Sequence, residues 1–297
     1  MSDITLTAAT RTNLLSLQRT VRLVGRTQER LATGLKVNSA LDDALAFFKA
    51  RNLNSRATDL MSIKDNITDG INIIKASIQG LESVEQTLKQ MKALALSAIS
   101  SPESSSRSKI ASQFNELRSQ IDNLMEDANF NGVNLLKNSI ASFRPGSDLL
   151  TVKFNERTEA LAINQLVVSG LSTSDFNTIA ARSALVLGTP GMTTVWGQTG
   201  PAAITAINRA LRSIDSALVT VRQSAQTFGT RSALLEIRRT FTENIINTLR
   251  GGAGDLVNAD LNEESANLLS LQTRQQLGTI SLSIAQQSEQ AILRLFN

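Results

Sequence analysis

The 297-residue sequence contains no cysteine, no histidine and no tyrosine. Without the first two, the chain can form no disulfide, no zinc site of nitrogen and sulfur ligands, and no Ser-His-Asp or Cys-His nucleophile pair. Aromatic residues are also few, at ten phenylalanines and one tryptophan, whereas proteins that bind single-stranded nucleic acid stack bases on aromatic side chains. The net charge of +4 is therefore weak support for a nucleic-acid partner. We predict no enzyme activity, no cofactor and no metal.

Long apolar runs and a secretory leader are missing as well. No apolar run reaches the roughly 18 residues that a membrane-spanning helix needs, so we expect no membrane insertion. Residues 1–5 lack the basic start and the apolar block of a signal peptide. The sequence predicts either a cytoplasmic protein or one exported without signal cleavage.

Proline is confined to the middle of the chain, at Pro102, Pro145, Pro190 and Pro201. Because proline is disfavoured inside helices, two long helical regions should flank an interrupted centre. Apolar residues recur every three or four positions in both regions, which predicts helices over about 10–33, 43–98, 110–124, 202–250 and 261–295. We expect the apolar phase to shift after Gly229, to Leu234, Ile237 and Phe241, and a flexible joint at residues 251–254.

The centre has a different pattern. Leu150, Val152 and Phe154 alternate with polar residues, as do Leu161 and Ile163 across Ala162, which predicts a β-hairpin with its loop at residues 155–158. Residues 188–200 are rich in glycine and should form a surface excursion that Trp196 packs down.

The terminal helices carry more apolar surface than two paired helices can bury. Leu15 and Leu23 lie off the main stripe of the first helix, and Leu269, Leu271 and Leu282 widen that of the last. Exposed apolar surface marks association sites, so we favour self-assembly over a bundle closed within one chain. The stripe residues are Leu14, Leu17, Val21, Val24 and Leu31 in the first helix and Leu277, Ile280, Ile284, Ala291 and Leu295 in the last.

Paired carboxylates occur at two places. Asp42 and Asp43 could form a cation site, but Ser39 three residues before Asp42 matches the helix-capping pattern, so we interpret Ser39 and Asp42 as capping groups. Glu263 and Glu264 suit the positive end of the last helix.

Several motifs resemble those of bacterial flagellin. Residues 31–44 (LATGLKVNSALDDA) resemble the family's L-S-T-G-x-x-I-N-S-A-x-D-D-A-A signature, and residues 130–136 (FNGVNLL) its F-N-G-x-x-L-L segment. Residues 258–260 (NAD) and 275–279 (QQLGT) resemble its D-A-D and Q-Q-x-G-T pattern. The resemblance covers about residues 1–140 and 202–297.

This resemblance implies a mainly α fold, a long antiparallel helical rod whose N- and C-terminal helices pair as a coiled coil, with a small β-hairpin region in the middle. Residues 1–41 and 255–297 would form an inner-tube domain, in which the stripe residues pack between subunits. Residues 42–140 and 202–254 would form an outer helical rod domain, and residues 141–201 the hairpin and a short variable excursion.

The function implied is that of a structural subunit that self-assembles into the flagellar filament for swimming. The resemblance further implies extracellular localisation in the flagellum and export of the unfolded chain through the flagellar type III apparatus without signal cleavage. The implied partners are other copies of the chain, an export chaperone, the export apparatus, and the filament cap and hook-junction proteins.

One stretch departs from the family pattern. Many flagellins of the enteric group carry L-Q-R-V-R-E-L, which a Toll-like receptor recognises, and here residues 88–94 read LKQMKAL. Gln90 replaces an arginine, so with Lys89, Lys92 and Leu94 beside it we expect weak recognition.

Two alternatives remain, and a third is excluded. A hook-filament junction protein shares the terminal architecture but tends to carry an S-x-D-D-P pattern, whereas position 44 is alanine. A metallopeptidase inserted in a flagellin frame requires histidines that the chain lacks. A cytoplasmic coiled-coil adaptor would stay in the cytosolic fraction and never sediment.

Overall fold

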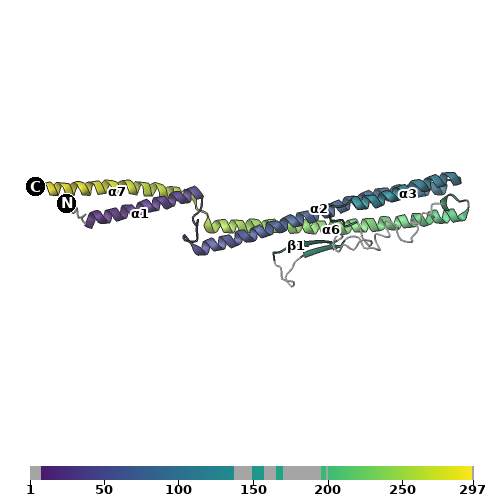
Figure 1. Cartoon of the computed structure of the whole chain (residues 1–297), viewed down its shortest axis with the longest axis horizontal. Coiled ribbons are helices and arrows are strands. Elements are labelled where there is room, and N and C mark those ends of the chain that lie inside the picture. The colour runs from purple at the N-terminus through teal and green to yellow at the C-terminus, as the bar shows by residue number, and fades with distance from the viewer. Residues whose placement is uncertain (1–7, 137–148, 157–164, 170–194, 199, 296–297) are drawn as a thin grey trace. The chain divides into compact units, whose positions relative to one another are not determined.

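A computed structural model describes residues 8–136, 149–156, 165–169, 195–198 and 200–295, with the side chains of 8, 9, 149, 289 and 292–295 excepted. Its elements are α1 (Ala8–Thr33), α2 (Ala44–Ser100), α3 (Ser104–Asp127), β1 (Leu149–Lys153), β2 (Gln165–Ser169), α6 (Pro201–Val257) and α7 (Leu261–Leu295) (Figure 1). This mainly helical architecture with one small antiparallel sheet confirms the predicted fold class. Residues 161–163 and most of the predicted excursion lie outside the described residues.

The chain divides into two compact units. The terminal unit comprises residues 1–58 and 247–297, and the central unit comprises residues 59–246. Both boundaries fall inside α2 and α6, further into these helices than the sequence-based boundaries after residues 41 and 254. The β-hairpin belongs to the central unit.

Heptad spacing organises the core of the central unit. Buried residues recur every seven positions along α2 and along α6, which is the pattern of helices that pack along a continuous seam. The two helices run antiparallel, because Glu85 pairs with Arg222 and Lys92 with Asp215. The seam residues are Leu60, Ile67, Ile74, Leu81 and Leu88 in α2 and Ile207, Ile214, Val221, Phe228 and Leu235 in α6.

The expected phase shift after Gly229 is wrong. The buried series of α6 continues in the same register through Leu235 to Thr242, while Leu234, Ile237 and Phe241 are exposed. They form a second apolar stripe on another face of the helix. The sequence pattern at this point contains two stripes, and the more hydrophobic one faces outward.

The expected joint at residues 251–254 is also absent, because α6 continues without a break to Val257. Ala253, between the glycines, is buried, and a Cβ on Gly252 would lie 3.9 Å from Leu53 of α2. Packing against the first turns of α2 therefore holds this segment helical, although each glycine costs about 1 kcal/mol of helix propensity.

The hairpin packs on α2. β1 and β2 are antiparallel, with Leu150 opposite Val168 and Val152 opposite Leu166. Leu150, Val152 and Val168 are buried, so alternate residues face the core as the sequence predicted for the first strand. A Cβ on Gly70 would lie 2.7 Å from Val152, and this close approach is why a glycine stands inside α2.

Residues 195–198 are anchored on α3, next to the start of α6. Trp196 is buried and its ring centroid lies 5.0 Å from that of Phe114. The Arg107 guanidinium donates to the carbonyls of Trp196 and Gln198 and also to Ser101 and Pro102 in the α2–α3 turn. One side chain thus fixes two backbone segments, and Trp196 packs its segment down as the sequence predicted.

Candidate functional site

The inner seam of α1 is more polar than the sequence-predicted stripe. Seven buried or half-buried positions are spaced as a heptad series: Thr10, Asn13, Leu17, Thr20, Val24, Thr27 and Leu31. Leu17, Val24 and Leu31 belong to the predicted stripe, Leu14 is half-buried beside it, and Val21 is exposed.

The inner seam of α7 likewise differs from the predicted stripe. Its less exposed positions are Glu264, Leu268, Leu271, Gln275, Gly278, Leu282 and Ala285. Arg30 bonds to Glu264, and a Cβ on Gly278 would lie 3.1 Å from Leu17, so α1 and α7 are antiparallel and these positions face α1. The described part of the terminal unit thus contains the predicted pair of terminal helices.

The predicted residues of α7 lie on its opposite side. Leu277, Ile280 and Ile284 follow heptad spacing, Leu269 lies on the same side of the helix, and the four side chains are 55 to 66% exposed. Ala291 is exposed on the same series, and the side chain of Leu295 lies outside the described residues. We call Leu269, Leu277, Ile280, Ile284 and Ala291 the outer stripe of α7.

Backbone pairing joins the segment that follows α1 to the segment between α6 and α7. Gly34 adopts φ +70° and its N–H donates to the Arg30 carbonyl, which ends α1. The Lys36 and Val37 N–H groups then donate to the Val257 carbonyl, and the Ala259 N–H donates to the Gly34 carbonyl. Two of the flagellin-like motifs, 31–44 and 258–260, therefore meet where these two segments pair, and we call this place the crossing.

Asp42 orders the turn after this crossing rather than capping α2. Its Oδ2 accepts from the Asn38 and Ser39 N–H groups and from Ser39 Oγ. The Ser39 backbone hydrogen bond is the main reason that the pKa of Asp42 lies below its usual value. The cap of α2 is Asp43, whose Oδ1 accepts from the Ala46 N–H 3.0 Å away.

Glu263 lies at the positive end of α7, as the sequence-based interpretation expected, and Glu264 beside it also contacts another helix. Asp260 Oδ1 accepts from the Asn262 and Glu263 N–H groups, and Glu263 and Glu264 occupy the first turn. Glu264 also has a partner on another helix, since Arg30 Nη1 lies 2.8 Å from its Oε1. This nearly buried carboxylate ties the end of α1 to the start of α7.

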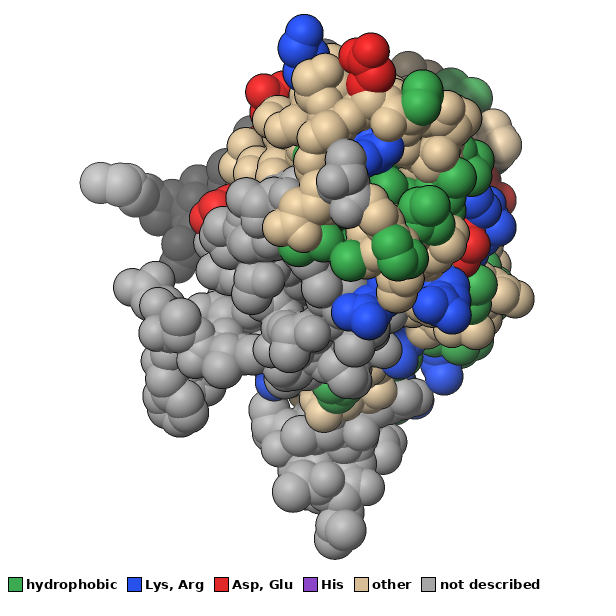
Figure 2. All heavy atoms as spheres, turned by 90° about the vertical axis from the view of Figure 1, so that its right-hand side faces the viewer, with side chains coloured by type: hydrophobic (Ala, Val, Ile, Leu, Met, Phe, Trp, Pro, Cys, Tyr) green, Lys and Arg blue, Asp and Glu red, His purple; other side chains and the backbone are tan. Residues whose placement is uncertain are grey.

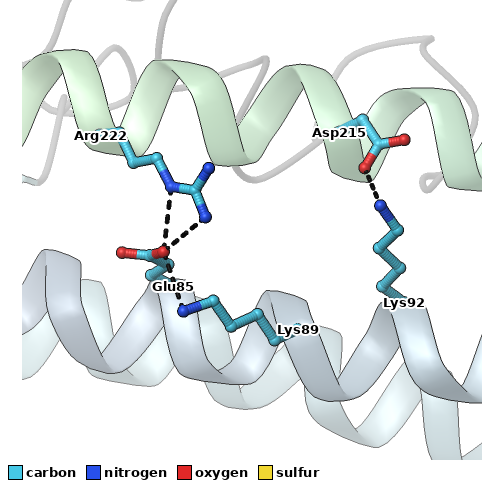
Figure 3. Close-up of polar contacts among 5 residues, drawn as sticks. All are labelled: Glu85, Lys89, Lys92, Asp215 and Arg222. Carbon is cyan, nitrogen blue, oxygen red and sulfur yellow. Dashed lines mark hydrogen bonds and ion pairs between the residues drawn. The ribbon is translucent and has the colours of Figure 1, made fainter.

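Ion pairs align α2 with α6 at the stretch expected to meet a receptor (Figure 3). Glu85 Oε1 accepts from Lys89 on the same helix and from Nε and Nη2 of Arg222 on α6. The hydrogen bonds from Lys89 and then Arg222 lower the pKa of Glu85. Lys92 Nζ lies 2.6 Å from Asp215.

Both lysines of that stretch are thus bound within the chain. Gln90 is exposed and Leu94 is half-buried. The expectation of weak receptor recognition stays a prediction.

Residues 4–141 match the family described as the bacterial flagellin N-terminal helical region, and residues 211–296 match the bacterial flagellin C-terminal helical region. The chain belongs to the bacterial flagellin family. This flagellin is 34% identical over 272 residues to Flagellin FljK of Caulobacter vibrioides, which covers 91% of the chain and 89% of the relative. It is 27% identical over 297 residues to a flagellin of Brucella melitensis, over 100% of the chain and 99% of the relative.

A solved structure has a similar fold. The putative flagellar hook-associated protein from Vibrio parahaemolyticus matches this flagellin with a TM-score of 0.58 and 18% identity, over 73% of the chain and 100% of that protein. This likeness supports the fold alone. Membership of the family identifies the chain as a structural component of the flagellar filament.

This flagellin offers surfaces rather than a chemical centre in its described part. Among those residues, no group of three or more acidic, histidine or cysteine side chains could hold a metal, and no helix is long and apolar enough to cross a membrane. The central unit also exposes apolar side chains that the sequence analysis did not identify as surface residues, among them Leu96, Ile204 and Val219. Figure 2 shows apolar and charged side chains beside one another on one end of the molecule.

Proposed function

We propose that this flagellin self-assembles into the helical flagellar filament and that the outer stripe of α7 packs against other copies. The exposure of Leu277, Ile280 and Ile284 at heptad spacing, with Leu269 exposed on the same side of the helix, is the observation that supports this most directly. Seven-residue spacing is what a helix needs in order to pack along another helix. The sequence-predicted packing residues of α7 are therefore available for contacts outside the chain.

The energy of this contact is substantial. Burying a leucine or isoleucine side chain fully contributes about 1.5–3 kcal/mol. Each of the four large side chains exposes somewhat more than half of its surface, so covering them contributes roughly 4–7 kcal/mol per copy. Contacts between two different patches that do not close into a ring produce an open helical polymer.

Export before assembly follows from the same proposal. The chain lacks cysteine, so it needs no disulfide formation after secretion, and the polar inner seam of α1 and α7 suits a pair that folds late. We propose passage through the flagellar type III apparatus with an export chaperone, followed by placement beneath the filament cap and beyond the hook-junction proteins. The filament would then lie outside the cell.

Seeded polymerisation tests the assembly proposal. Purified chain should elongate short filament fragments, and Leu277→Ser with Ile284→Ser should raise the critical concentration at least about tenfold, as expected from two lost apolar contacts. Ser283→Ala, an exposed position off the stripe, is the matched control. Unchanged Trp196 fluorescence would show that the central unit remains folded.

Two results would contradict this function. A native chain that forms a stable dimer and never elongates seeds would rule out the filament subunit. A double variant that polymerises like the native chain would instead remove the outer stripe from the contact.

Deletion of residues 286–297 should also stop assembly while leaving the helix around Ile67 to Leu88 folded, which circular dichroism would check.

A further inference from the structure

The face of α1 that points away from α7 is an arginine stripe, formed by Arg11, Arg19, Arg22 and Arg26. All four are exposed, and Leu15, 52% exposed, lies among them. Arg26 contributes to the lowered pKa of Asp42. Arg11, Arg19 and Arg22 make no ion pair within the described part of the chain. Glu29 is the only acidic residue of this helix.

The opposite charge lies where α6 ends and α7 begins. Asp255 and Glu263 flank the crossing, and both carboxylates lack an ion-pair partner among the residues that the structure describes. Asp42, Asp43 and Asp260, by contrast, are engaged in hydrogen bonds to backbone N–H groups. We call Asp255 and Glu263 the acidic junction; Leu261, 50% exposed, lies beside Glu263.

These two surfaces cannot neutralise each other within one copy. Arg30 contacts Glu264, which is next to Glu263 of the acidic junction, so the junction lies at the level of Arg30 along the axis of α1. At 1.5 Å per residue, Arg22, Arg19 and Arg11 lie about 12, 16 and 28 Å further along the helix axis. An arginine side chain is too short for these gaps, so the complementary charges remain separated.

We propose that the arginine stripe of one copy binds the acidic junction of the next copy along the filament. This inference rests on the proposed function and specifies one of its contacts. The chain itself supplies both charges, displaced along one helix, so a copy shifted along that helix brings them together without closing a ring. An anionic lipid surface fits less well, because the apolar face that a membrane helix inserts is occupied by α7.

Charge reversal with mixing tests the pairing in the full chain. Arg19→Glu with Arg22→Glu changes the net charge from +4 to 0, and Asp255→Arg with Glu263→Arg changes it from +4 to +8. Each double variant should slow seeded elongation about tenfold or more, because opposed surfaces then carry like charges. The fourfold variant restores the net charge of +4 and should recover elongation.

An equimolar mixture of the two double variants should also recover elongation. The acidic stripe of the first variant can meet the arginine-bearing junction of the second, and the arginine stripe of the second can meet the acidic junction of the first. Recovery of both the mixture and the fourfold variant would support the pairing. Elongation that is unchanged in both double variants, or lost in them and not recovered by mixing, would overturn it. If the native chain itself fails to elongate seeds, the filament function fails instead. Helical circular dichroism and Trp196 fluorescence report folding throughout.

Discussion

Replacing Gly80 with alanine sets two effects of opposite sign against each other. Alanine favours the helix by about 1 kcal/mol over glycine, so propensity alone predicts a more stable protein. However, a Cβ at position 80 would lie 2.7 Å from Ala128 Cβ and 2.7 Å from Leu136 Cδ1. Ala128 cannot rotate out of the way, and Leu136 is fully buried. Overpacking typically costs about 1–3 kcal/mol, and with two contacts this short we expect the upper end.

We therefore expect Gly80→Ala to lower the free energy of unfolding by about 2 kcal/mol, which is the cost of the clash minus the gain in helix propensity. Gly229→Ala in α6 is the matched control, because a Cβ there meets nothing within 4 Å, and it should gain about 0.5–1 kcal/mol. Urea unfolding followed by Trp196 fluorescence measures both, since that residue is buried in the same unit. A Gly80→Ala protein as stable as the native one would refute the close approach of α2 and residues 128–136.

Three further changes probe polar contacts. Folding favours the charged form of Glu85, so its contribution to the free energy of unfolding is complete above its unfolded pKa and is lost as pH falls through its lower folded pKa. Glu85→Gln should therefore remove this acid dependence and lower the free energy of unfolding by about 0.5–1 kcal/mol at neutral pH. Urea unfolding measured as a function of pH checks both effects. Arg107→Lys cannot reach four carbonyls at once and should lower the unfolding free energy by about 1–2 kcal/mol in the same assay. Asp43→Ala should cost about 1 kcal/mol of local stability at the start of α2, visible as faster amide exchange there.

Helix positions followed from sequence because proline placement and apolar spacing are local properties. The α1, α2 and α7 segments were predicted to within two residues. The prediction for α3 missed the first six residues of that helix, and the first strand of the hairpin was found by its alternation. The break at residues 251–254 could not be excluded in this way. Whether consecutive glycines stay helical depends on tertiary contacts such as that of Gly252 with Leu53, which the local pattern does not contain.

The choice of face was harder than the choice of helix. α7 carries two heptad series, and hydrophobicity favours Leu277, Ile280 and Ile284, yet the series that faces α1 includes Gln275 and Gly278. The same inversion occurs in α6, where Thr242 is buried and Phe241 is exposed. A sequence pattern ranks stripes by apolar content, and that ranking identifies the inner seam only when the chain buries its most apolar surface within itself.

The inversion has an energetic consequence for the terminal helices. Polar residues such as Thr20 and Gln275 in a helix seam fix the register at a cost in stability, and the Arg30–Glu264 pair, whose arginine is 30% exposed, adds no more than about 1 kcal/mol. A 26-residue helix such as α1 also gains most of its stability from packing rather than from propensity. The inner seam therefore sets how α1 and α7 align, while the larger apolar contribution of the outer stripe is realised only against another copy. For the proposed filament subunit, this division leaves the terminal pair weak during export and strong once it is surrounded.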